Sequence, residues 1–132
     1  MKKVPVLFIL ILVALLLNTC REGFLGVPDY FRGYYQSNNP ILDDKTYLLI
    51  YVATGSLTIY LSEDGDTNIT SDNIKEYASI SPYNIIGLDY NYTFDTGSMN
   101  GTVNFNGRYG ADVKIEEYNP PFTIKTYCKK VN

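Results

Sequence analysis

The clearest pattern in this sequence is a strict alternation of apolar and polar residues in its second half. Between residues 86 and 95, every even position is apolar and every odd position is polar or glycine. Successive side chains of a β-strand point to opposite faces, so the pattern predicts one strand with a buried and a solvated face. We therefore expect Leu88 and Tyr90 to be buried, and Asp89 and Asn91 to be exposed.

Shorter patterns of the same kind predict strands on both sides of this one. Each is bounded by residues that favour turns, such as Asn38-Asn39-Pro40 and Asn100-Gly101. In the last segment the alternation places Cys128 on the inner face. The other predicted strands span residues 30–37, 47–53, 56–62, 77–81, 102–106, 111–116 and 122–128.

The spacing of these segments indicates the fold class. Connections are short apart from the polar residues 63–73, and short connections favour antiparallel neighbours. No long helix is available to cover the apolar faces, so the sheet has to cover itself. The sequence predicts an all-β domain, an antiparallel up-and-down barrel of about eight strands, with a β-sandwich as the alternative.

The first twenty residues differ from the rest of the chain. Two lysines precede an uncharged apolar run at residues 4–17, the pattern of an export signal. The run has about 14 residues, whereas spanning a bilayer takes roughly 20. We expect a signal peptide at residues 1–19, a tether at residues 20–29 and the β-barrel domain at residues 30–132.

The end of this leader, Leu17-Asn18-Thr19-Cys20, resembles the signal of bacterial lipoproteins at Leu17 and Cys20. The resemblance implies a lipid on Cys20, an extracytoplasmic location in the cell envelope and attachment to a membrane. Two alternatives remain, plain secretion and an uncleaved anchor. The alternative to a lipid on Cys20 is a disulfide bond between Cys20 and Cys128.

Composition excludes several function classes. After residue 20, nine lysine and arginine residues stand against fourteen acidic ones, and this negative balance argues against nucleic acid as a partner. The chain has no histidine and two cysteines, so we expect no enzyme, no metal site and no cofactor. Asp64, Asp66 and Asn68 have the spacing of calcium ligands, but the later EF-hand positions are wrong and an acidic turn is the better interpretation.

The first strand begins with Phe31-Arg32-Gly33-Tyr34-Tyr35, and the chain here resembles lipocalin-like barrels, also called calycins. In that family a Gly-x-Trp motif opens the first strand, and a basic side chain from the end of the last strand packs across the tryptophan. An exposed first strand beside an unpaired last strand would leave two open edges, so we expect Gly33 and Tyr35 to close the barrel by meeting the last strand, residues 122–128. Lys125 or Lys129 is the expected basic partner.

Two functions follow from these expectations. An anchored barrel could bind a small apolar or amphipathic ligand in its mouth. Alternatively, a barrel filled by side chains acts as a surface or structural protein through protein–protein contacts. The thirteen tyrosines are expected mostly to fill the core, unless several gather as a lining for a ligand or a partner.

Overall fold

The computed structural model describes residues 27–131, so the predicted signal peptide and Cys20 lie outside the described residues. Two single-turn 3-10 helices, η1 (Asp29–Phe31) and η2 (Pro82–Asn84), accompany the strands. The strands are β1 (Gly33–Ser37), β2 (Thr46–Val52), β3 (Leu57–Glu63), β4 (Ile74–Ile80), β5 (Ile85–Leu88), β6 (Asn91–Asp95), β7 (Met99–Phe105), β8 (Gly110–Tyr118) and β9 (Pro121–Val131).

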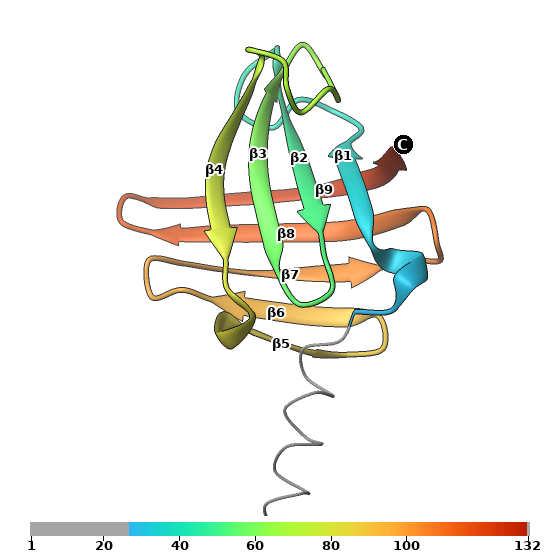
Figure 1. Cartoon of the computed structure of the whole chain (residues 1–132). Helices are drawn as coiled ribbons and strands as arrows, with labels where there is room; N and C mark the ends of the chain where they lie inside the picture. Colours follow the sequence, from blue (N-terminus) through green and yellow to red (C-terminus); the bar gives the residue numbers. More distant parts are fainter. Residues whose placement is uncertain (1–26, 132) are drawn as a thin grey trace, which may run out of the picture.

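The nine strands form one continuous antiparallel sheet with the order β4-β3-β2-β1-β9-β8-β7-β6-β5. The sheet curls so that β1–β4 stand upright in front of β5–β9, which run across them (Figure 1). The apolar faces of the two layers pack against each other and form the core. This arrangement confirms the predicted all-β, antiparallel up-and-down fold.

The curled sheet is a half-barrel with one open seam. The first and last strands are paired, with Tyr34 opposite Val131 and Ser37 opposite Cys128. The sheet ends at β4 and β5, which follow each other in the chain but are not hydrogen-bonded to each other. The free edges therefore lie in the middle of the sequence. The alternative of two separate sandwich sheets is wrong, because a single sheet supplies both layers.

The prediction of one strand over residues 86–95 is wrong. The chain turns back at Asp89, whose φ is +61°, and forms the hairpin β5–β6 in which Leu88 lies opposite Asn91. Residues that lie opposite each other in a hairpin share a face. Across this two-residue turn, even-numbered residues of β5 pair with odd-numbered residues of β6, so the face changes from even to odd positions. Leu88 and Tyr90 are therefore exposed, whereas Tyr92 and Phe94 are buried. Asp89 and Asn91 are exposed, as predicted.

In β8 and in most of β9 the apolar alternation faces the core as the sequence predicts, although Phe122 at the start of β9 is exposed. Ala111, Val113 and Ile115 of β8 are buried, and so are Ile124 and Cys128 of β9. On β2 three successive residues, Leu48–Ile50, are completely buried, so the centre of this strand is covered on both faces.

Candidate functional site

The junction of the first and last strands is closed by Tyr35 and Lys130, which lie directly opposite each other. The Nζ atom of Lys130 lies 5.8 Å from the centroid of the Tyr35 ring and donates a hydrogen bond of 3.0 Å to the Tyr30 carbonyl. A Cβ atom added to Gly33 would lie 3.1 Å from Cε of Lys130. Gly33 thus leaves room for the lysine stem, and η1, β1 and β9 are joined at one point.

The prediction of Lys125 or Lys129 as the basic partner is wrong, and strand alternation explains why. Tyr35 points into the core, so its partner on β9 must share the inner face with Ile124 and Cys128. Lys125 and Lys129 occupy the opposite face, where they lie across from Lys114 and Gln36 respectively.

The interior between the two layers is filled by aromatic rings. Phe105 is stacked on Phe31 with centroids 4.4 Å apart, and it also contacts Tyr35 at 5.5 Å and Tyr92 at 5.9 Å. The Tyr35 hydroxyl donates a hydrogen bond of 2.7 Å to the Phe31 carbonyl, so the polar end of this buried ring is satisfied. The four side chains occupy the space that a ligand would need.

One small apolar cavity remains beside this aromatic cluster. Its volume is about 30 Å³, and Val27, Leu57, Ile85 and Phe94 are among its lining residues. That volume is about the share of one water molecule, whereas sites for small molecules measure about 300–1,000 Å³. This cavity is therefore too small to hold a small-molecule ligand.

The tyrosines lie mostly outside the core, contrary to the sequence-based expectation. Among all thirteen, only Tyr35 and Tyr92 are buried. Tyr34, Tyr51 and Tyr60 lie on the outer face of β1, β2 and β3, because their chain neighbours Tyr35, Ile50 and Ile59 are the residues that face the core. We call this surface the tyrosine face.

The tyrosine face is held in place by its packing. Tyr34 and Tyr51 lie opposite each other with ring centroids 4.6 Å apart. Tyr60 lies opposite Leu49, which is completely buried although its side chain belongs to the outer face of β2. Gln36, on the other side of Leu49, donates a hydrogen bond of 3.4 Å to the Asp66 carbonyl. The face therefore contains a packed pair of tyrosine rings beside a completely buried leucine.

Burial and neighbouring charges shift the pKa values of three groups near these features. Burial raises the pKa of Tyr35 to about 12, and burial with the nearby Asp112 charge raises the pKa of the Cys128 thiol to about 12. Partial burial, followed by the proximity of Tyr34, raises the pKa of Tyr60. All three groups are thus held in their protonated, neutral forms, and none is activated as a nucleophile.

The remaining polar groups assemble no metal or catalytic centre in the described part of the chain. The carboxylate of Asp66 accepts hydrogen bonds from the Asn68 amide at 2.9 Å and from the Asn73 side chain at 3.3 Å, so it serves to order the turn. Across residues 27–131, no group of three or more acidic or cysteine residues is placed to hold a metal ion. No helix in that range has the length and hydropathy needed to cross a membrane.

Comparison with known proteins gives no match: no family model, curated protein or solved structure is similar to this chain.

Two features of the candidate site were not predicted from the sequence. The position of Lys130 follows from the register of β1 and β9, because Tyr35 pairs with residue 130 and Ser37 with Cys128. Alternation along the last strand places residue 130 on the inner face with Ile124 and Cys128, but no local pattern encodes the register that sets it opposite Tyr35. The tyrosine face, by contrast, had a signal: the apolar run of β2 with tyrosines at 47 and 51 indicated an outer face that is not purely polar.

Proposed function

We propose that this chain is an exported protein of the cell envelope, held at a membrane by lipid on Cys20, whose half-barrel binds another protein through the tyrosine face. The observation that carries the proposal is the contrast between the inside and the outside of the domain. The interior is filled, with a cavity of about 30 Å³. The outer face of β1–β3 instead presents Tyr34, Tyr51 and Tyr60.

The chemistry of this face is that of a protein-binding surface. Tyrosine is enriched at protein interfaces because a rigid ring buries a large area while its hydroxyl still bonds to a partner or water. Across the sheet, Gln36, Leu49 and Tyr60 lie opposite one another in turn. Lys129 lies opposite Gln36 at one end of this row and Glu76 opposite Tyr60 at the other, so each side of the face carries a charge. Charges at the rim of an interface favour specificity and association rate more than affinity.

A lipocalin-like relationship is part of this proposal. It is supported by the one-turn helix η1 before β1, by Gly33 and Tyr35 at the start of that strand, and by the basic side chain of Lys130 across the Tyr35 ring. Binding of a small apolar ligand, the other expectation, has less support because the aromatic cluster around Phe105 occupies the interior.

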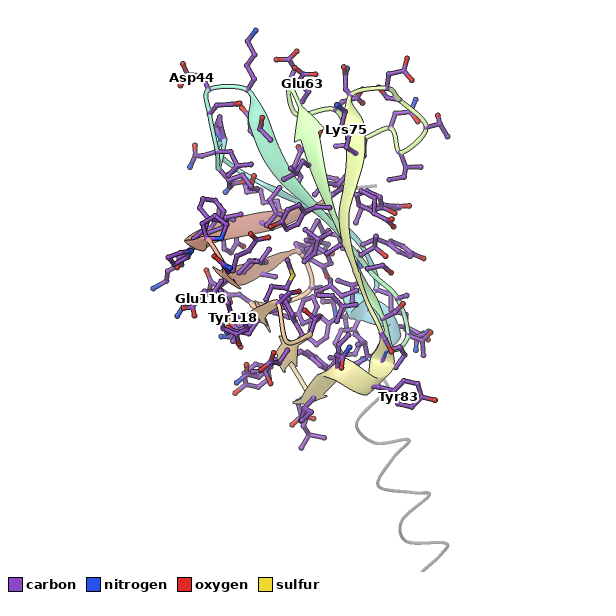
Figure 2. All side chains as sticks on the ribbon, turned by 90° about the vertical axis from the view of Figure 1, so that its left-hand side faces the viewer. Asp44, Glu63, Lys75, Tyr83, Glu116 and Tyr118 are labelled. Carbon is purple, nitrogen blue, oxygen red and sulfur yellow. The ribbon has the colours of Figure 1, made fainter. Side chains whose placement is uncertain are left out.

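Site-specific photo-crosslinking in the cells that produce the protein tests the proposal. A benzophenone amino acid replaces Tyr51 in one variant and Tyr118 in the control; both positions are exposed, and Tyr118 belongs to the other layer (Figure 2). We expect a discrete protein conjugate from position 51 and none from position 118. No conjugate at position 51, or the same conjugates from both positions, would contradict a partner at the tyrosine face.

A further inference from the structure

The edge strand β5 and its flanking turns expose four large apolar or aromatic side chains within eight residues. Tyr83 is 86% exposed, Ile86 63%, Leu88 67% and Tyr90 60%. Single exposed apolar residues are common, but a cluster in one short segment marks a contact surface. We call these four residues the β5 patch.

The β5 patch is almost uncharged. Among residues 81–94, Asp89 is the only charged residue. Ile86 and Leu88 share the outer face of β5, because they lie opposite the exposed Thr93 and Asn91 of β6. Tyr83 and Tyr90 flank these aliphatic residues on both sides. Aliphatic side chains between tyrosines match the interface of a bilayer, where aromatic rings lie at the level of the headgroups.

The β5 patch lies at the end of the domain where the described chain begins. The described chain begins at Val27, whose amide donates a hydrogen bond of 2.8 Å to the Thr54 carbonyl. Val27 and Ile85, the residue before Ile86, line the same small cavity. The patch therefore starts where the chain enters the domain. Figure 2 shows Tyr83 pointing away from the body at this end, opposite the end that carries Glu63 and Lys75.

Only six residues separate Cys20 from Val27. Fully extended, the chain from Cys20 to Val27 reaches about 25 Å. An anchor at residue 20 thus keeps this end of the domain close to the bilayer and leaves the opposite end, with the loop between β3 and β4, farther away.

We propose that the β5 patch rests in the interface of the membrane to which the chain is anchored and so fixes the orientation of the domain. This inference rests on the anchoring part of the proposed function. Because the patch carries no basic residue, the contact depends on insertion of apolar groups, and neutral phosphatidylcholine is sufficient as the lipid.

Tryptophan fluorescence in vesicles tests this contact, because the natural chain contains no tryptophan. The full chain, carrying Leu88→Trp, is reconstituted into phosphatidylcholine vesicles whose lipids are brominated on the acyl chains near the headgroup. The matched control is Ile69→Trp, which replaces an exposed aliphatic residue in the loop between β3 and β4. Tyr90→Trp is a second reporter on the patch and changes the hairpin less.

We expect the emission at position 88, and at position 90, to shift to shorter wavelength and to be quenched by the brominated lipids, while the emission at position 69 stays unquenched. A chain that floats with the vesicles but leaves positions 88 and 90 unquenched overturns the contact and leaves the anchor intact. If the emission at position 88 is already shifted to shorter wavelength without vesicles and sedimentation shows a dimer, the patch binds a second copy of the chain and the membrane contact is overturned. A chain that does not float overturns the anchor itself, and the contact with it.

Discussion

Gly101 on β7 lies directly opposite Phe94 on β6, and the missing side chain of the glycine makes room for the phenylalanine ring. A Cβ atom at residue 101 would lie 2.4 Å from Cζ of Phe94 and 2.2 Å from the carbonyl oxygen of Lys114. Both distances are far shorter than a van der Waals contact, and the second involves the backbone of β8, which has little freedom to move. Gly101 is therefore a packing requirement of the inner face.

Gly101→Ala is expected to lower the free energy of unfolding by about 1–3 kcal/mol, the range for overpacking a core. Asn104→Ala, an exposed position on the same strand, should change it by less than about 0.5 kcal/mol. Urea unfolding followed by circular dichroism measures both. Equal stability of the two variants would show that β6 and β7 can separate to accept the methyl group.

Lys130→Ala should lower the free energy of unfolding by about 1–2 kcal/mol, because it removes the cation from the Tyr35 ring and the hydrogen bond to the Tyr30 carbonyl. Lys129→Ala is the matched control, since Lys129 is exposed on the other face of β9. It should cost less than about 0.5 kcal/mol. If Lys129→Ala destabilised the domain as much as Lys130→Ala, the contact with Tyr35 would have no special role.

The two halves of the β5–β6 hairpin should respond differently to truncation. Phe94→Ala removes a ring that is only 4% exposed and should cost about 3–5 kcal/mol. Leu88→Ala removes a side chain that is already in solvent and should cost less than about 0.5 kcal/mol in the absence of membrane. Chemical denaturation compares them, and a large loss from Leu88→Ala would restore the single-strand interpretation of residues 86–95.

This hairpin also indicates how far the sequence predicts the structure. Period-two alternation correctly identified the inner faces of β8 and β9, because each of those strands is uninterrupted. It failed at residues 86–95 because a two-residue turn leaves the apolar–polar alternation of the sequence unbroken. The apolar residues face solvent before the turn and the core after it. Asp89 and Asn91, residue types that tolerate turns, were the available signal. The face of Lys130 follows from the alternation of β9, but its place opposite Tyr35 could not be predicted, because it depends on pairing between residues that are far apart in the chain.

The stability of the domain should fall at alkaline pH. Burial raises the pKa of Tyr35 from 10.0 to about 12, so the folded state holds this proton more tightly than the unfolded state does. The neutral Tyr35 side chain contributes fully to the free energy of unfolding below about pH 10, and this contribution is lost as the pH rises toward about 12. Tyr35→Phe should therefore reduce the decline in unfolding free energy over that window, measured by urea unfolding at a series of pH values. A decline as steep as that of the natural protein would contradict this assignment.

The mass of the protein purified from its own membrane, recorded first under native and then under denaturing conditions, tests most directly that it is an anchored domain with a filled interior. We predict a polypeptide that begins at Cys20 and carries several acyl groups, since a single acyl group binds a membrane only marginally. We also predict that no small molecule is lost on denaturation, because the interior cavity measures about 30 Å³. An unmodified Cys20 would contradict the anchor, and the stoichiometric loss of a bound ligand would contradict the filled interior.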